Sequence, residues 1–245
     1  MGASSAGASS RGDRGAAQRL GHRVLLVLGT LAGIALSWIA LTWLTLPAVS
    51  GYADSWPDRT AYMRIRIAEA ARRGEELELR YRPVPLSQVP QALRRAVLVS
   101  EDAAFFDHSG FDWFELRAAL DKAWREREVP RGASTITQQL ARNLYLSPRR
   151  DPSRKLREAL ITRRLERRLT KNRILELYLS VIELGQGVFG VDAAARHYFG
   201  VAVSGISAHQ AAMLAATIPS PLRDNPATDT RRFRWRTGLI AGRAF

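Results

Sequence analysis

The feature that most constrains this chain is an apolar run from Val24 to Leu46 that contains no charged residue. A helix of this length crosses the roughly 30 Å hydrocarbon core of a bilayer while satisfying its own backbone hydrogen bonds. A cleaved signal peptide is the alternative interpretation. Its apolar region usually has only about 7 to 15 residues, and Trp38 and Trp43 stand towards the far end of this run. The pattern therefore favours a retained transmembrane helix.

Basic residues on one side of this run predict its orientation. Four arginines precede it and are opposed only by Asp13, namely Arg11, Arg14, Arg19 and Arg23. Because cytoplasmic flanks are enriched in Lys and Arg, we expect a single-pass protein of the plasma (inner) membrane with a cytoplasmic N-terminus. The expected parts are a cytoplasmic basic tail (1–23), a transmembrane helix (24–46), a linker (47–59) and an external domain (60–245).

The external part is itself basic. The whole chain has 37 Lys and Arg against 23 Asp and Glu, and removing four arginines and one aspartate before the linker leaves 33 against 22. Such a domain, tethered beside a bilayer, meets anionic lipid headgroups first, so a lipid-phosphate ligand is favoured over nucleic acid. The chain has no cysteine, which excludes disulfides and thiolate metal sites.

Hydrophobic spacing predicts a mainly α-helical domain. Residues 1–22 are poor in large apolar side chains and are expected to be disordered. A helix is expected from Thr60 to Arg73, closed by Gly74, and a short isolated strand from Leu77 to Arg82. Beyond Pro90, helical spacing dominates. The helices are separated by residues that break helices, at Pro130–Gly132, Pro148–Pro152, Gly185–Gly190 and Gly200–Gly205.

The first string with chemical potential begins with two adjacent carboxylates, Glu101 and Asp102, and continues through aromatic residues to His108 and Gly110. Adjacent carboxylates suit acid–base chemistry. The alternative is structural, with the two carboxylates solvated at a helix end and His108 making a hydrogen bond in a turn.

The second string runs from Arg131 to Arg142 and predicts a turn that leads into a helix capped by Ser134 or Thr135. Thr135 and Gln138 have the spacing of a capping box. A helix start offers free backbone amides to an anion, and Thr135, Gln139 and Arg142 recur on one face. A well-capped surface helix with an ordinary arginine is the alternative.

The third string starts a helix at Ser153 and sets Arg154 and Glu158 one turn apart, with Lys155 between them. These residues form either an exposed ion pair worth a few tenths of a kcal/mol or two cations and a carboxylate directed at one phosphorylated sugar. Two later strings, 171–180 and 190–200, are expected to serve mostly in packing.

In this order the strings resemble the motifs of the family 51 glycosyltransferases, the peptidoglycan polymerases: E-D-x-x-F-x-x-H-x-G, G-G-S-T-I-T-Q-Q, R-K-x-x-E and K-x-x-I-L-E-x-Y-L-N. The resemblance covers about residues 60 to 226. Three departures stand out. Ala133 replaces a glycine, Arg142 stands where lysine is usual, and Ser180 replaces an asparagine, which leaves the role of that amide open.

Many relatives carry a second, transpeptidase domain with a Ser-x-x-Lys motif. None of the three lysines here, Lys122, Lys155 and Lys171, has a serine three positions earlier. The chain therefore resembles the monofunctional biosynthetic transglycosylases. The resemblance implies a lysozyme-like helical lobe with a small jaw next to the membrane, including part of the segment from Phe111 to Val129.

The resemblance also implies a reaction and roles for residues. A GlcNAc 4-hydroxyl of lipid II attacks the anomeric carbon of a growing glycan and releases undecaprenyl pyrophosphate, with inversion. Glu101 matches the catalytic base and Glu158 the second essential carboxylate. The implied substrate-binding residues are Asp102, His108, Ser134, Thr135, Gln138, Gln139, Arg142, Arg154 and Lys155. A divalent cation, Mg²⁺ or Mn²⁺, is expected at the pyrophosphate, and no organic cofactor.

The expected partners are lipid II, the growing lipid-linked glycan, the membrane and proteins of cell-wall synthesis or division, but no nucleic acid. Two other functions are compatible with the residues. A membrane-anchored, lysozyme-like glycan hydrolase also needs two carboxylates, although it has no need of a cation cluster for pyrophosphate. A non-enzymatic basic binding protein would not depend on Glu101.

Overall fold

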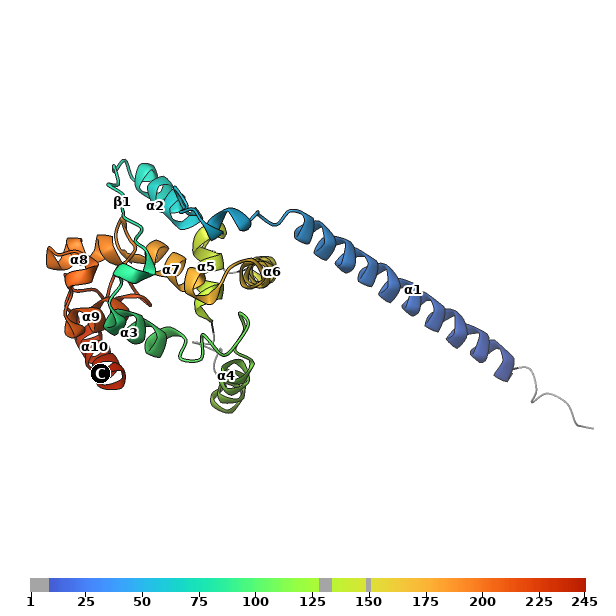
Figure 1. The fold of residues 1–245 in the computed structure, drawn as a ribbon. Helices are drawn as coiled ribbons and strands as arrows, with labels where there is room; N and C mark the ends of the chain where they lie inside the picture. Colours follow the sequence, from blue (N-terminus) through green and yellow to red (C-terminus); the bar gives the residue numbers. More distant parts are fainter. Residues whose placement is uncertain (1–8, 128–133, 149–150) are drawn as a thin grey trace, which may run out of the picture. The chain divides into compact units, whose positions relative to one another are not determined.

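The computed structural model describes residues 9–127, 134–148 and 151–245, and these residues are mainly helical, as the sequence predicts (Figure 1). The chain divides into two compact units, Met1–Leu46 and Pro47–Phe245. The α-helices of the described residues are α1 (Ser9–Leu44), α2 (Ala61–Arg72), α3 (Gln91–Glu101), α4 (Trp113–Glu126), α5 (Ile136–Tyr145), α6 (Pro152–Arg168), α7 (Lys171–Val181), α8 (Val191–Phe199), α9 (Ala208–Thr217) and α10 (Arg231–Ala244). Three short 3₁₀ helices are η1 (Ser50–Ala53), η2 (Leu86–Gln88) and η3 (Val203–Gly205).

The first unit consists of α1. Within it, Leu25–Leu44 is long and apolar enough to cross a membrane, which is compatible with a single-pass anchor. The helix begins at Ser9, so the expectation of disorder through residue 22 is wrong from that residue on. Extending an existing helix costs far less than nucleating one, and the Ala, Gln, Leu and Arg of the preceding segment are good helix formers.

The second unit contains two groups of packed helices (Figure 1). In one group, α5 packs against α6, α7 and α2. In the other, α3, α9 and α10 pack against one another. The buried positions follow helical spacing, as in α10, where Phe233, Thr237, Ile240 and Ala244 are buried. Alanines in α9, including Ala211, Ala212 and Ala215, are also buried. Their small side chains let neighbouring helices approach closely.

The predicted helix starts are present, with small differences. Thr60 caps α2, which ends just before Gly74 at φ +73°. Thr135 caps α5 in a capping box with Gln138, as the sequence predicts. The helix expected from Ser153 begins one residue earlier, at Pro152, because the side chain of Asp151 accepts the backbone N–H of Arg154 and forms the cap.

A three-stranded sheet lies beside the helices in the order β1–β3–β2. Strand β1 (Arg80–Tyr81) falls within the segment predicted as a strand, but it is not isolated, because it pairs in parallel with β3 (Val188–Phe189). Strand β2 (Glu183–Gly185) pairs antiparallel with β3 through a tight turn. The glycine-rich segment that the sequence suggested as a break is therefore a hairpin.

Helix α4 exposes a row of large apolar side chains. Trp113, Phe114, Leu120 and Trp124 are all exposed, and Trp124 retains 89% of its accessible surface. Asp112 caps this helix by accepting the backbone N–H of Glu115. An apolar face left open to this extent usually marks a surface for another partner or a membrane.

Candidate active site

Glu101 is the last helical residue of α3, and it lies where the two helix groups meet. Pro90 precedes the helix, and Leu93, Ala96 and Val97 anchor it in the core. The chain leaves helical geometry at Asp102, whose φ and ψ are −168° and 78°. A buried, rigid helix thus delivers the Glu101 carboxylate at its C-terminal end.

Two side chains from other helices hold the Glu101 carboxylate. Gln139 of α5 donates through Nε2 to Oε2 at 3.1 Å, and Arg236 of α10 donates through Nη2 to Oε1 at 3.1 Å. The side chain of Glu101 is only 10% exposed. Burial raises the pKa of Glu101 above its ordinary value, and the hydrogen bonds from Gln139 and Arg236 and the charge of Arg142 oppose this rise. A carboxylate with a raised pKa is a better proton acceptor near neutral pH.

The contact of Arg236 with Glu101 could not be predicted from the sequence. Arg236 lies 135 residues from Glu101 along the chain, and its neighbours in α10 give no motif that marks it. Its Nε is buried without a hydrogen-bond partner in the described part of the chain. The available signal was weak: an arginine within an amphipathic helix, three residues after Phe233 and one before Thr237, both of which are buried.

Gln139 is itself held by a buried tyrosine. The hydroxyl of Tyr178, on α7, donates to Gln139 Oε1 at 2.9 Å. Because an ionised carboxylate can only accept, the amide nitrogen of Gln139 must face Glu101 and its oxygen must face Tyr178. Gln139 thus joins α7 to the carboxylate at the end of α3.

Asp102 and His108 are both predicted to bind substrate. In the described structure they form hydrogen bonds with each other and with backbone groups. Asp102 Oδ1 contacts His108 Nε2 at 2.9 Å, and Asp102 Oδ2 accepts the backbone N–H of Ile136 at 2.9 Å. His108 Nδ1 accepts the backbone N–H of Gly110 at 3.1 Å, which leaves Nε2 to donate to Asp102. These bonds hold the loop after α3 against the start of α5.

The start of α5 is consequently less open to an anion than the sequence suggested. The backbone N–H of Ile136 is bound by Asp102, and that of Gln138 by the Thr135 hydroxyl. The side chain of Gln138 turns back to accept the Thr135 N–H, and the Thr135 hydroxyl donates to the Gly110 carbonyl. The expectation of free amides at this helix start is therefore wrong for these two groups, because protein oxygens bind them.

Asp102, His108 and Asp112 form a cluster that could hold a metal ion, with one ligand atom from each within 4.8 Å of the others. The two carboxylates suit Mg²⁺ or Mn²⁺, whereas the imidazole suits softer ions such as Zn²⁺. Both ring nitrogens of His108 are already engaged, and Asp112 also caps α4. A metal would have to displace one of these bonds, so the cluster as arranged does not fit a resident ion.

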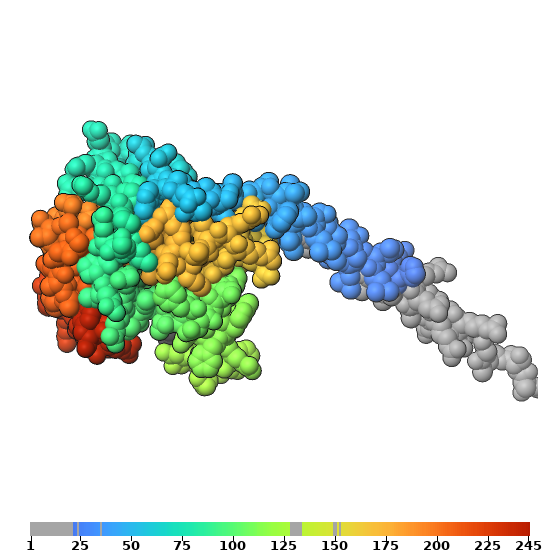
Figure 2. Space-filling view, in the orientation of Figure 1, coloured from blue at the N-terminus to red at the C-terminus, as the bar shows by residue number. Residues whose placement is uncertain are grey.

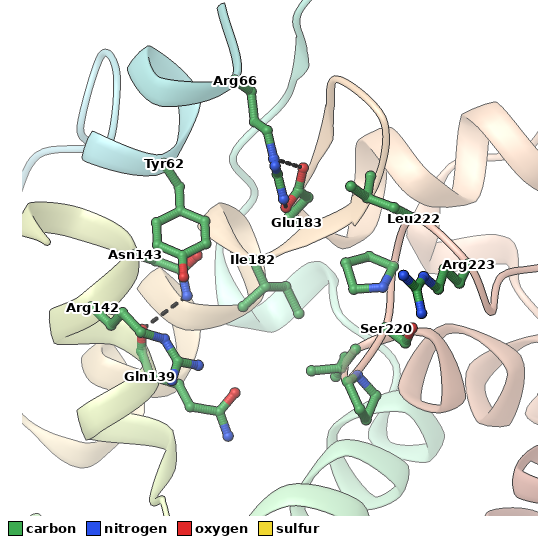
Figure 3. Close-up of a pocket in the computed structure, with 13 residues that line it drawn as sticks. Tyr62, Arg66, Gln139, Arg142, Asn143, Ile182, Glu183, Ser220, Leu222 and Arg223 are labelled. Carbon is green, nitrogen blue, oxygen red and sulfur yellow. Dashed lines mark hydrogen bonds and ion pairs between the residues drawn. The ribbon is translucent and has the colours of Figure 1, made fainter. Parts of the chain in front are cut away.

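A cavity of about 330 Å³ opens on one side of α5 (Figure 3). Gln139, Arg142 and Asn143 line it from α5, and three of its residues are arginines: Arg66, Arg142 and Arg223. Glu183 neutralises Arg66 through two hydrogen bonds of 2.7 and 2.8 Å. The Nε of Arg142 is buried and has no partner among the described residues. Arg142 and Arg223 form no ion pair with an acidic side chain among the described residues, so the cavity offers positive charge next to Gln139, which binds Glu101.

A second cavity, of about 550 Å³, is lined by Glu101 itself. Ser134 and Thr135 line it from the start of α5, with Asp102 and His108 on the loop after α3. Its charged lining residues are otherwise acidic, including Asp107, Asp112 and Glu115. Such a lining suits a neutral ligand with hydroxyl groups better than an anion.

Arg154, Lys155 and Glu158 form a separate cluster on α6 and are not among the described residues that line either cavity. Glu158 is 1% exposed and accepts from Arg154 Nη1 at 2.8 Å and from Lys155 Nζ. The alternative of an exposed ion pair is therefore wrong, because the carboxylate is buried. The three charges compensate one another in the described structure.

Two of the departures from the family motifs can be located. Arg142 points into the 330 Å³ cavity (Figure 3). Ser180 is buried, and its hydroxyl bridges the backbone N–H and carbonyl of Val84 at 3.4 Å each. Ala133, together with the turn at residues 131 and 132, lies outside the described residues.

Comparison with known proteins gives a consistent family. The chain matches the family described as "Transglycosylase" over residues 69–244. A protein of Laribacter hongkongensis named biosynthetic peptidoglycan transglycosylase is 42% identical over 222 residues, covering 89% of this chain and 95% of the relative. Proteins of the same name from Dechloromonas aromatica (41% identical; 91% and 96% covered) and Methylobacillus flagellatus (46%; 67% and 72%) are also similar. The chain belongs to the transglycosylase family.

Proposed function

We propose that this protein is a peptidoglycan glycosyltransferase that polymerises glycan chains from lipid II at the outer face of the plasma (inner) membrane. The observation that carries the proposal is the Glu101 carboxylate, buried between Gln139 and Arg236 and flanked by two cavities of different charge. The names of the relatives supply the substrate class.

The two cavities suit the two substrates of such a reaction. The donor glycan carries a pyrophosphate, and the cavity with Arg66, Arg142 and Arg223 offers it cations. The acceptor presents a neutral GlcNAc, which suits the cavity lined by Glu101, Ser134 and Thr135. Glu101 lines the proposed acceptor cavity and accepts a hydrogen bond from Gln139, which lines the proposed donor cavity, and this supports its assignment as the base.

In the proposed step, the GlcNAc 4-hydroxyl oxygen bonds to the anomeric carbon of the donor while the bond from that carbon to the pyrophosphate oxygen breaks. Glu101 accepts the hydroxyl proton, and undecaprenyl pyrophosphate leaves with the bonding electrons. Attack opposite the leaving group inverts the anomeric configuration. Fixed cations lower the barrier because negative charge develops on the leaving oxygen, and Arg142 is the cation we assign to it.

The cluster on α6 is assigned a second role. Arg154 and Lys155 would bind the phosphate side of the donor once the ligand competes with Glu158 for the two cations. A divalent cation, Mg²⁺ or Mn²⁺, would accompany the pyrophosphate, and the cluster of Asp102, His108 and Asp112 does not fit it as arranged. No part of the proposed step depends on that ion.

The membrane arrangement belongs to the same proposal. Leu25–Leu44 would cross the membrane with the N-terminus in the cytoplasm. The exposed Trp113, Phe114 and Trp124 of α4 support a jaw that touches the bilayer, because such side chains favour the membrane interface. A reporter fused after Phe245 should be active only if it matures outside the cytoplasm. Activity of a reporter that requires the cytoplasm would contradict the proposed topology.

One experiment separates this function from its rivals. The full chain in detergent is incubated with lipid II and, separately, with finished peptidoglycan. The proposal expects polymer from lipid II and no cleavage of peptidoglycan. Release of fragments from peptidoglycan would favour a glycan hydrolase, and inertness towards both substrates would favour a basic binding protein.

A further inference from the structure

The face of α6 that points away from the core carries five arginines, which we call the α6 basic face: Arg157, Arg163, Arg164, Arg167 and Arg168. On a helix with 3.6 residues per turn, these positions lie away from the buried residues Glu158, Ile161, Thr162 and Leu165. Four of the five arginines are exposed, and Arg164 is half-buried. The half-buried Leu156 and Leu160 lie among them.

No carboxylate of the described residues neutralises the exposed arginines of this face. The two acidic residues of α6 point elsewhere. Glu158 pairs with Arg154 and Lys155, and Glu166 pairs with Lys171 at 2.9 Å. No ion pair joins Arg157, Arg163, Arg167 or Arg168 to an acidic side chain in the part of the chain that the structure describes. Positive charge is therefore concentrated on this surface, which favours an anionic partner.

The α6 basic face lies next to the residues that follow the expected membrane helix, and this position indicates which anion it binds. Arg164 Nη1 donates to the carbonyl of Pro47 at 3.2 Å, and the Tyr145 hydroxyl donates to the carbonyl of Ala48 at 3.2 Å. Figure 2 shows the gold surface that includes α6 next to the light-blue surface of the residues that follow Leu46. Only two residues separate Pro47 from Leu44, where α1 ends, so the chain can bridge at most about 11 Å between them.

We propose that the α6 basic face binds the phosphate groups of anionic phospholipids at the surface of the bilayer. The inference rests on the proposed function to the extent that α1 must anchor the protein in a membrane. Basic side chains beside a membrane with anionic lipids each strengthen binding by about five-fold. Electrostatic attraction of basic side chains to anionic lipids adds to the binding of helices at a membrane surface, and the half-buried Leu156 and Leu160 lie among these arginines. The membrane anchor α1 is part of the same chain and would hold this face near lipid headgroups. Nucleic acid and soluble polyanions would have to reach it by diffusion.

Binding of the α6 basic face to lipid phosphates would fix the distance of Arg154 and Glu158 from the membrane surface. Arg154 and Glu158 lie on the buried side of the same helix. A helix with its side chains is about 10 Å across, so these groups would lie roughly one helix diameter above the lipid phosphates.

The test uses the full chain in nanodiscs of phosphatidylcholine, with or without phosphatidylglycerol. The chain has no cysteine, so Leu160→Cys can be labelled specifically with a fluorophore on the basic face. Phosphatidylcholine with a spin-labelled headgroup, present at the same fraction in both discs, quenches the fluorophore when α6 lies on the surface. We expect stronger quenching with phosphatidylglycerol, and a loss of the difference at high salt.

A triple variant, Arg157→Gln/Arg163→Gln/Arg167→Gln, should weaken docking of α6 by roughly 100-fold and abolish the effect of phosphatidylglycerol. It should still polymerise lipid II in detergent at the wild-type rate, which also reports its folding. The matched control removes three exposed arginines from α10, Arg231→Gln/Arg232→Gln/Arg243→Gln, and should keep the effect. A label at Ser204→Cys, in η3 after α8, should not respond, because Figure 1 draws α8 and α6 at opposite ends of the second unit.

Quenching at position 160 that is the same in both lipids, or unchanged in the triple variant, would overturn the proposal. A response to inorganic polyphosphate in phosphatidylcholine discs without a response to phosphatidylglycerol would assign the face to a soluble polyanion and overturn it as well. Entry of the protein into the discs tests the anchor separately, and lipid II polymerisation in the same discs tests the proposed function. Polymerisation without lipid-dependent quenching would leave the function intact and refute only the lipid contact.

Discussion

The buried hydroxyl of Tyr178 donates a hydrogen bond to Gln139 Oε1 at 2.9 Å and so turns the Gln139 amide nitrogen towards Glu101. The tyrosine is completely buried on α7, and burial raises its pKa well above the ordinary value. Its hydroxyl therefore remains a proton donor throughout the working pH range. A residue without contact to either cavity thus orients the group that binds the Glu101 carboxylate.

Tyr178→Phe should lower the rate of polymerisation because Gln139 loses the bond that orients it. A loss of about 1 to 1.5 kcal/mol in positioning corresponds to roughly 10-fold in kcat. The unpaired, buried Gln139 oxygen should also cost about 1 to 3 kcal/mol of unfolding free energy. Tyr198→Phe is the control, because that hydroxyl donates only to the Leu184 carbonyl in the described structure. It should reduce stability but leave the rate unchanged. Equal rates for the two variants would contradict the orienting role.

Glu101→Gln should abolish bond formation but not binding. The amide keeps the size of the side chain and cannot accept the hydroxyl proton, so kcat should fall by about 10² to 10⁴. Rates on lipid II, with folding checked by circular dichroism and binding by a fluorescent lipid II analogue, measure this. A variant that polymerises within a few-fold of the wild type would show that Glu101 is not the base.

The pH dependence of kcat/KM should have an acid limb set by Glu101. Burial raises the pKa of this carboxyl, so the base becomes protonated, and the rate falls, at a higher pH than for an exposed glutamate. Arg236 lowers that pKa. Arg236→Gln should therefore move the acid limb to higher pH. Arg234→Gln, which removes an exposed neighbour paired with Asp229, should leave it in place. If the acid limb of kcat/KM has the same pH in Arg236→Gln as in the wild type, Glu101 is not the group that titrates there.

Arg154 and Lys155 should differ in their effect on stability although both pair with Glu158. The side chain of Arg154 is 15% exposed and that of Lys155 is 52% exposed. Arg154→Ala leaves a buried carboxylate short of its main partner and should cost about 3 kcal/mol. Lys155→Ala should cost less than about 1 kcal/mol. Denaturant unfolding of the two variants provides the comparison, and equal losses would contradict the described burial.

The donor contribution of these cations can be tested on the same variants. If they bind the pyrophosphate side, as proposed, both variants should raise the KM for the donor more than that for the acceptor. Unchanged kinetics in a folded Lys155→Ala protein would leave that lysine with a structural role only.

Gly190→Ala should be severely destabilising. Gly190 has φ +84°, and a Cβ there would lie 2.3 Å from the backbone oxygen of Ser180. Backbone cannot move aside cheaply, so we expect a loss of more than about 4 kcal/mol. Gly200→Ala is the matched control, because φ is +70° but no atom lies within 4 Å of the added Cβ. It should cost only about 1 to 2 kcal/mol of backbone strain.

Features encoded by neighbouring residues could be predicted from the sequence. The capping box of Thr135 and Gln138, the end of α2 at Gly74 and the apolar run of α1 each depend on side chains a few residues apart. Glu101 could be singled out because its string has a characteristic spacing. The pairing of β1 with β3 could not be predicted, because it joins segments more than 100 residues apart through backbone groups that every residue carries.

The environment of Glu101 was equally inaccessible to sequence reasoning. Asp102 accepts the backbone N–H of Ile136 at the start of α5. This bond could not be predicted, because it forms only when the loop after α3 folds back onto that helix. Arg236 and Tyr178 become relevant only when α10 and α7 are packed. Local spacing therefore singled out the proposed base, but the groups that set the pKa of its carboxyl come from packing between distant helices.

The contact between Glu101 and Arg236 has a consequence for the newly made protein. During translation α3 is synthesised well before α10, since 135 residues separate Glu101 from Arg236. A partly synthesised chain can thus carry every motif that precedes α10 and still lack the charge that holds the Glu101 carboxylate. Full activity would then appear only when α10 has emerged and docked on α3 and α9. Premature termination anywhere before Arg236 should leave a product that cannot draw on the cell's lipid-linked precursors at the normal rate.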